Sequence, residues 1–169
     1  MTSKLKSIME QAEVPIMEED IVLYLGASHG VTANIIAGIV GEKGFVFCLD
    51  LSYDTMPELL KLCEKNRNMC PLLFDASQPG QYKERVTEVD LIYQDLAQKS
   101  QAGILKRNAE MFLREGGHFI LIIKTQSIDT VKSPEEVLKE VKEELKEFEI
   151  KTIDINRTHA KHYAIIGKK

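Results

Sequence analysis

Residues 21–30 read IVLYLGASHG, and this segment decides the fold. Five apolar residues run into a stretch of small residues, in which Gly26 and Gly30 let the backbone turn sharply. A helical pattern begins near Thr32, so the segment predicts a buried strand, a tight loop and a helix. In an open α/β sheet, ligands bind beyond the carboxyl ends of the strands, where helix N-termini offer free backbone N–H groups. We therefore expect a ligand at this loop.

The alternation of short apolar runs with longer amphipathic stretches continues along the chain. Runs that predict strands lie at 21–25, 45–49, 69–74, 89–93, 119–123, 150–155 and 163–166, and helical patterns lie near 32–40, 57–65, 100–113 and 134–148. Strand–helix alternation predicts a parallel sheet, whereas the last two strands, joined by a short polar segment, predict an antiparallel pair. The expected fold class is α/β: a doubly wound, mostly parallel seven-stranded sheet with helices on both faces and an antiparallel C-terminal hairpin.

The domain organisation is expected to be simple. A chain of 169 residues fits one domain, and it contains no linker, repeat or low-complexity segment. We expect a single domain over 1–169, with an N-terminal helix at about 3–13 and a Rossmann-like core at about 20–169. The last predicted helix has the clearest start signal, because Ser133 is a natural N-cap, Pro134 takes the first helical position and Glu136 completes a capping box.

Charge and composition restrict the function classes. The net charge is −4, whereas a protein that binds nucleic acid unaided usually shows a basic face. Aromatic residues make up 7% and Trp is absent, so a base-stacking surface for single strands is not expected. Any nucleic-acid substrate should therefore be brought by a partner.

Cysteine usage and the N-terminal sequence point to the cytoplasm. The three cysteines are odd in number and lack C-x-x-C spacing, so neither a disulfide framework nor a metal site is expected. The first residues carry no apolar segment typical of a signal peptide, and no later run approaches the roughly 20 apolar residues of a membrane span.

Acidic residues follow the second and third predicted strands. The loop spacing is G-x-x-x-G, not the G-x-G-x-x-G of dinucleotide-binding proteins, and alone it is equally typical of a tight turn. Asp50 ends the second strand, about 20 residues beyond the loop, where an acid commonly binds ribose hydroxyls. Asp75 ends the third strand, where it could accept from an adenine amino group. Either carboxylate could simply cap the next helix, but together with the loop they favour a nucleoside ligand.

Asp95 and Lys124 end the fourth and fifth predicted strands and are expected to be neighbours. A lysine that closes an apolar strand is costly unless its charge meets a partner, and Asp95 is the obvious one. A salt bridge that merely ties two loops together is the structural alternative.

Several motifs occur in the order and spacing of fibrillarin. They are YLGA at 24–27, DA at 75–76, YQDLAQ at 93–98, FLREGGH at 112–118, IK at 123–124, SID at 127–129 and KSPEEV at 132–137. From about Ser3 to the C-terminus the chain resembles the fibrillarin family, and archaeal members more than eukaryotic ones, whose Gly/Arg-rich tail it lacks. The resemblance implies a class I S-adenosylmethionine-dependent methyltransferase that acts on a ribose 2′-hydroxyl of RNA.

The resemblance also implies a catalytic set of Lys4, Asp95, Lys124 and His162. Lys4 lies in TSKL, which is similar to the family's RSKL, and His162 corresponds to the family's Asp-His pair before its last strand. Without the family, Lys4 reads as a solvated charge and His162 as a loop histidine. Asp95 or Lys124 would orient the hydroxyl and help to remove its proton, and the sequence leaves open which of them is the base.

The resemblance further implies cofactor contacts at Gly26, Ala27, Ser28, Gly30, Val31, Thr32, Asp50, Leu51, Asp75, Ala76, Asp95, Leu96, Ala97 and Gln98. The chain departs from the family at two of these places and at the neighbouring position 29. Val31-Thr32 replaces a Thr-Thr pair, Leu51 replaces an aromatic residue, and His29 replaces a serine in the loop. These changes bear on the affinity for the cofactor more than on its identity. The small N-terminal β domain of the family is not expected either.

The family works in a box C/D ribonucleoprotein, so the expected partners are a substrate RNA with a guide RNA, a scaffold protein and, indirectly, a kink-turn-binding protein. The location is cytoplasmic for an archaeal-type chain and nucleolar for a eukaryotic one. Two alternatives stay open: a catalytically weak S-adenosylmethionine-binding subunit of an RNA–protein assembly, and a stand-alone methyltransferase for a non-RNA substrate. A NAD-dependent oxidoreductase is disfavoured by the loop spacing.

Overall fold

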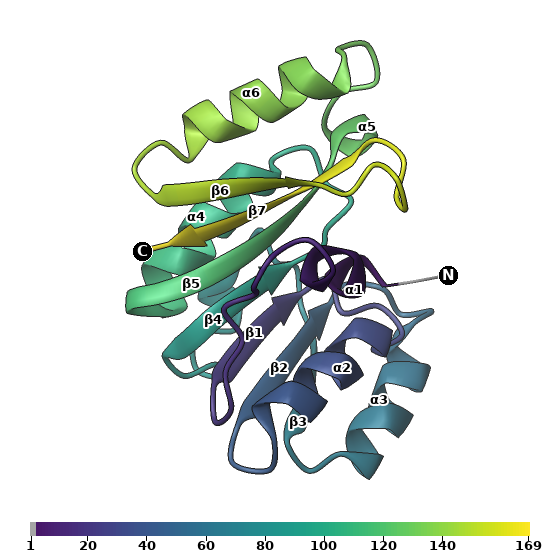
Figure 1. Cartoon of the computed structure of the whole chain (residues 1–169). Helices are drawn as coiled ribbons and strands as arrows, with labels where there is room; N and C mark the ends of the chain where they lie inside the picture. The colour runs from purple at the N-terminus through teal and green to yellow at the C-terminus, as the bar shows by residue number, and fades with distance from the viewer. Residues whose placement is uncertain (1–2) are drawn as a thin grey trace.

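The computed structural model describes residues 3–169, and its centre is a seven-stranded sheet with the strand order β3-β2-β1-β4-β5-β7-β6 (Figure 1). The strands are β1 (Ile21–Leu25), β2 (Phe45–Asp50), β3 (Met69–Leu73), β4 (Val89–Gln94), β5 (Leu113–Lys124), β6 (Glu149–Asp154) and β7 (His162–Lys168). The helices are α1 (Lys4–Met9), α2 (Val31–Val40), α3 (Met56–Lys65), η1 (Pro79–Gln81), α4 (Gln101–Phe112), α5 (Thr125–Ile128) and α6 (Pro134–Glu144).

The strand order confirms the expected topology. Strands β1 to β5 are parallel to one another, while β7 lies between β5 and β6 and is antiparallel to both. The direction in which successive strands are added changes between β1 and β4. Strands β2 and β3 follow β1 on one side, and the chain then returns to place β4 on the other side of β1. Loops that follow β1 and β4 therefore diverge at this point, which is where doubly wound sheets bind ligands.

Both faces of the sheet are covered. In β1, Val22 and Tyr24 pack on the side of α1, α2 and α3, while Leu23 and Leu25 pack on the side of α4 and α6. This alternation follows from the two-residue period of a strand. Since both faces are buried, the central strands are mostly apolar, as their sequences predicted. No helix among residues 3–169 is long and apolar enough to cross a membrane.

Three element ends differ from the sequence predictions by three residues or more. The N-terminal helix was expected over about 3–13 but spans Lys4–Met9. The helix expected at 134–148 ends at Glu144, since the chain turns there and sets the Phe148 ring edge-on against Phe119 at 5.2 Å.

The strand expected at 119–123 begins instead at Leu113, through the polar residues 114–117. Pairing across the molecule explains this extension. The backbone N–H of Gly116 donates to the Lys169 carbonyl (3.1 Å), and the Lys169 N–H donates to the Gly117 carbonyl (2.9 Å). The short helices η1 and α5 were not expected from the sequence.

Candidate active site

The loop after β1 is shaped by backbone conformations that side chains disfavour. Gly26 has φ +90°, Ser28 +50° and Gly30 +84°, all in the left-handed region. A Cβ at position 26 would lie 2.6 Å from the backbone oxygen of Asp95, so only glycine allows the ends of β1 and β4 to approach so closely. The N–H groups of Gly26 and Ala27 donate to the Leu49 carbonyl at 2.8 and 3.0 Å, which ties the loop to β2.

Asp50, the last residue of β2, holds this loop. One carboxylate oxygen accepts from the Ser28 N–H at 2.7 Å and the other from the Ser52 N–H at 2.8 Å. Each oxygen retains acceptor capacity, because a carboxylate oxygen can accept two hydrogen bonds. The structure thus gives Asp50 a role in the loop, in contrast to the alternative that it caps the following helix. Leu51 beside it is half exposed.

Asp75 follows β3 and accepts a hydrogen bond from the Ser77 N–H at 2.8 Å. That bond is the main reason why the pKa of the Asp75 carboxyl lies below its usual range. The neighbouring Ala76 is buried, and its carbonyl accepts from the Tyr82 hydroxyl and the Asn108 amide. The Asp75–Ala76 segment is therefore fixed to the α4 side of the core.

Lys4, Asp95 and Lys124 form a three-membered ion cluster. Lys4 Nζ lies 2.9 Å from Asp95 Oδ2, and Lys124 Nζ lies 2.8 Å from Asp95 Oδ1. The Lys124 ammonium also donates to the Asp95 backbone carbonyl at 3.1 Å. The exposed fractions of the side chains are 22%, 11% and 21%, so solvent screens these charges only in part. Because two ammonium groups meet one carboxylate, the cluster carries a net positive charge.

Helix α1 carries Lys4 to this cluster across 91 residues of sequence. Leu5 and Ile8 of the helix are fully buried against the sheet, and the Ser3 hydroxyl caps it by accepting from the Lys6 N–H at 3.2 Å. Burial of one face of so short a helix fixes where its first residue points. Apart from the family resemblance, no local pattern in the sequence predicts this contact.

His162 lies close to the cluster but does not touch it. It pairs with Lys124 in the antiparallel register of β7 and β5, and its Nδ1 lies 2.7 Å from the Ala160 carbonyl. That contact assigns the proton to Nδ1, so Nε2 of the neutral imidazole is an acceptor. His159, three residues earlier in the same loop, has a buried Nε2 without a partner among the described residues. Burial, and then the Lys4 ammonium, lower the pKa of His159.

Two cavities flank the ion cluster and share Lys4 and Lys124 in their walls. The first, of about 240 Å³, is lined by Lys4, Tyr24, Gly26, Ala27, Ser28, His29, Val31, Thr32, Asp95 and Lys124. The second, of about 380 Å³, is lined by Lys4, Lys124, Gln126, Ser127, Ala160, Lys161 and His162. Lys4 and Lys124 therefore separate two cavities, one at the glycine loop and the other at the loop before β7.

The structure brings together only some of the residues expected to contact a cofactor. Those that line the first cavity are Gly26, Ala27, Ser28, Val31, Thr32 and Asp95. Gly30, the N-cap of α2, lies outside its lining. So do the residues at or after the ends of β2, β3 and β4, namely Asp50, Leu51, Asp75, Ala76, Leu96, Ala97 and Gln98.

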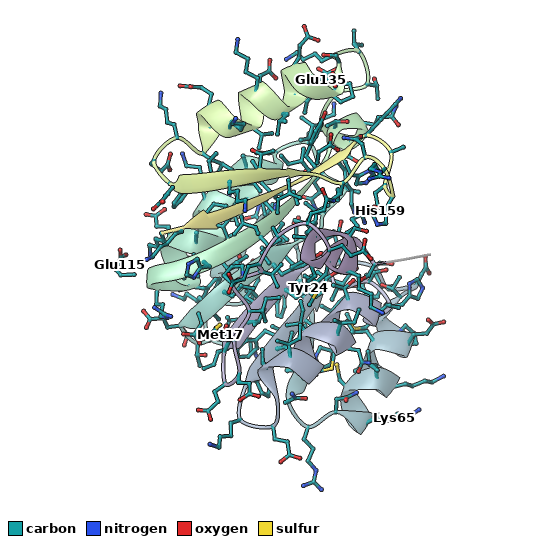
Figure 2. All side chains as sticks on the ribbon, in the orientation of Figure 1. Met17, Tyr24, Lys65, Glu115, Glu135 and His159 are labelled. Atoms are coloured by element: carbon teal, nitrogen blue, oxygen red, sulfur yellow. The ribbon has the colours of Figure 1, made fainter. Side chains whose placement is uncertain are left out.

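Tyr24 lines the first cavity and was not expected there. Figure 2 labels it in the middle of the molecule, on β1. Burial, and then the Asp95 carboxylate, raise the pKa of its hydroxyl well above the ordinary value, so it stays neutral and is no candidate base. The signal that could have found it is its place one residue before the end of the strand that feeds the loop.

Chemically, the arrangement suits a reaction between two molecules. A carboxylate with both oxygens held by ammonium groups has a fixed orientation. It lines the cavity at the glycine loop, and the two lysines that hold it also line the second cavity. A donor group bound at the loop would face an acceptor hydroxyl held at this carboxylate. Fixed orientation of this kind accelerates reactions between bound partners.

Comparison with known proteins gives consistent results. A family model described as Fibrillarin matches residues 1–169. A fibrillarin-like rRNA/tRNA 2′-O-methyltransferase of Methanopyrus kandleri is 42% identical over 157 residues, which are 91% of this chain and 68% of that protein.

Two solved structures are similar over nearly the whole chain. One, of a fibrillarin/Nop5p complex, has a TM-score of 0.93 at 41% identity and covers 98% of this chain and 80% of that one. The other, Aeropyrum pernix fibrillarin with natively bound S-adenosyl-L-methionine, has a TM-score of 0.89 at 36% identity and covers 97% of this chain and 74% of that one.

Proposed function

The chain belongs to the fibrillarin family, and we propose that it transfers a methyl group from S-adenosylmethionine to a ribose 2′-hydroxyl of RNA. The observation that carries this proposal is the Lys4–Asp95–Lys124 cluster in the wall between two cavities. Relatives at about 40% identity carry the name rRNA/tRNA 2′-O-methyltransferase, and a similar structure contains S-adenosyl-L-methionine.

The residues of the loop side fit S-adenosylmethionine. Gly26 lets the end of β1 lie directly against Asp95 at the end of β4, and α2 begins at Val31 with its first N–H groups directed at the loop. Asp50 retains acceptor capacity for ribose hydroxyls, and Asp75 can accept from the adenine amino group. Leu96, Ala97 and Gln98 complete the proposed site. When bound there, the cofactor supplies a methyl group made electrophilic by its sulfonium.

The residues of the cluster align the acceptor and take up its proton. Lys4 donates to both oxygens of Asp95 and Lys124 to Oδ1, so the remaining acceptor capacity on Oδ2 can hold the 2′-hydroxyl. As the hydroxyl oxygen gains the methyl, its proton leaves to the Asp95 carboxylate, or to Lys124 where that side chain stands as the neutral amine. Positioned proton transfer of this kind is worth roughly 10²–10⁴-fold in rate. His162 contributes its free Nε2 on the acceptor side.

We place the chain, as one domain, in a cytoplasmic box C/D ribonucleoprotein. A net charge of −4 favours an arrangement in which other components hold the substrate. A guide RNA would pair with the target, a scaffold protein would bind this chain, and a kink-turn-binding protein would take part indirectly. The similar structure of a fibrillarin with Nop5p supports a scaffold of that type.

The test is transfer of a labelled methyl group to a target RNA in the presence of guide RNA and a Nop5p-type scaffold. Asp95→Asn and Lys124→Ala should each lower kcat by about 10²-fold or more, because each removes a group that orients or deprotonates the hydroxyl. Lys65→Gln, an exposed lysine at the end of α3, is the control and should leave kcat unchanged.

Cofactor titration calorimetry on each variant separates transfer from binding. Wild-type protein that binds S-adenosylmethionine but never methylates RNA in the full assembly would favour the alternative of a binding subunit. Normal transfer by both cluster variants would overturn the proposed mechanism.

A further inference from the structure

The second cavity is lined by cationic and neutral groups alone. Among the residues that line it are three lysines, Lys4, Lys124 and Lys161, together with His162. Lys4 and Lys124 share one carboxylate, so the cluster keeps one positive charge, and Lys161 adds a second. A cavity of this charge favours an anionic ligand.

Unused hydrogen-bond donors surround the same cavity. Among residues 3–169, the side chains of Gln126, Ser127 and Lys161 make no hydrogen bond. Of the two ring nitrogens of His162, only Nδ1 makes a hydrogen bond within the described residues, to the Ala160 carbonyl. An ammonium offers three N–H donors, a hydroxyl one and an amide two, so the site suits a ligand with several acceptor oxygens.

Lys161 has a backbone conformation that its residue type disfavours. Its φ is +61°, in the left-handed region, where glycine or asparagine is the usual choice. Hydrogen bonds hold it there on both sides: its N–H donates to Asn156 Oδ1 at 2.7 Å, and its carbonyl accepts from Thr125 Oγ1 at 2.9 Å. Strained residues of this kind cluster at functional sites, and here the side chain lines the cavity.

We propose that this cavity binds the phosphodiester on the 3′ side of the ribose to be methylated, with Lys161 as its principal ligand and Gln126 and Ser127 as neutral donors. The inference rests on the proposed function. In RNA the 3′-phosphate is attached to the carbon next to the one that bears the 2′-hydroxyl. A hydroxyl held at Asp95 therefore brings that phosphate beside Lys4 and Lys124, which form the wall common to both cavities.

The experiment combines a protein variant with a substrate variant in the full guide-RNA assembly. Lys161→Gln is compared with wild type on two target RNAs, one unmodified and one with an uncharged methylphosphonate at the 3′ linkage of the target nucleotide. On the unmodified RNA, the variant should raise KM about fivefold with kcat nearly unchanged. The slope of log(kcat/KM) against log[salt] should become shallower by about 0.7, the value for one phosphate contact on a single strand.

On the methylphosphonate RNA the same substitution should have little effect, because the charge that Lys161 meets is already gone. Such non-additivity identifies a direct contact. Lys161→Arg should retain the wild-type KM. Lys65→Gln removes the same charge at the lower end of the molecule, well away from His159 in Figure 2, and should change neither quantity.

Lys161→Gly distinguishes ligand binding from a structural role. Glycine adopts a positive φ without strain, so the melting temperature of this variant should equal or exceed that of wild type. Its KM should rise as it does for Lys161→Gln. An unchanged KM in both variants, or an equal loss on both RNAs, would overturn the inference and leave the proposed function intact. A wild-type assembly that transfers no methyl group to either RNA would instead overturn the proposed function.

Discussion

Gly26 determines how closely two strand ends meet at the candidate site. Its φ is positive, and a Cβ at this position would lie only 2.6 Å from the Asp95 carbonyl oxygen. Any other residue would therefore require a shift of the backbone. The loop and the ion cluster are therefore coupled through one backbone contact. The glycine was expected from its place after a buried strand, but not its contact with residue 95.

Gly26→Ala should lower the free energy of unfolding by about 2 kcal/mol or more, from the strained φ and the overlap with the Asp95 carbonyl. Affinity for S-adenosylmethionine should fall with it. Urea denaturation and calorimetric titration measure the two effects. Gly38→Ala is the matched control, since a Cβ there meets nothing within 4 Å and lies inside α2, where alanine is favoured by up to about 1 kcal/mol.

His159 should make stability depend on pH. Burial lowers the pKa of its imidazole from the ordinary 6.5, and the Lys4 ammonium lowers it further. Below about pH 6.5 the unfolded chain therefore binds more protons than the folded chain, so the free energy of unfolding falls as the pH drops. His159→Gln should reduce this fall. Urea denaturation of the wild type and the variant at pH 7.5 and 5.5 checks this prediction. An equal fall in the free energy of unfolding of both proteins would contradict it.

At the scale of elements, α6 illustrates how sequence sets a helix start. The Ser133 hydroxyl accepts from the Glu136 N–H at 3.2 Å, and the Glu136 carboxylate accepts from the Ser133 N–H at 2.8 Å. Both bonds of the expected capping box are thus present. The box is local, because its partners are three residues apart, which is why the sequence could predict it.

Ser133→Ala should cost about 1 kcal/mol of stability, because it removes the acceptor for an N–H of the first turn. Ser100→Ala provides the control. Ser100 also precedes a helix, α4, but its side chain makes no capping bond. The Ser100→Ala substitution should therefore change the free energy of unfolding by no more than about 0.5 kcal/mol. Chemical denaturation midpoints compare the two, and equal costs would show that the capping box contributes nothing.

For the whole molecule, cofactor binding should stabilise the fold. The proposed cofactor residues come from the ends of β1, β2, β3 and β4, which are assembled only in the folded chain. At a concentration 100 times Kd, S-adenosylmethionine should add about 2.7 kcal/mol to the free energy of unfolding. For a chain of this size that corresponds to a rise in melting temperature of roughly 5–10 °C. NAD at the same concentration should give no rise, and an equal rise would favour an oxidoreductase.

The sequence alone determined the fold class, the family and most of the elements. Strand β1 spans the expected residues, the antiparallel pair at the C-terminus is confirmed, and so is the Asp95–Lys124 ion pair. These features follow from local patterns, namely apolar runs, caps and turns, whose period and order can be read without knowledge of distant contacts.

Only the tertiary structure decided what depends on contacts between distant segments. It extended β5 to Leu113 by pairing with the C-terminus, and it brought Lys4 to Asp95 across 91 residues. It also set Lys161, whose φ no local pattern predicts, in the wall of a cavity next to that cluster. The physical reason is that an ion pair or a cavity wall exists only once burial of the elements has fixed where their ends lie.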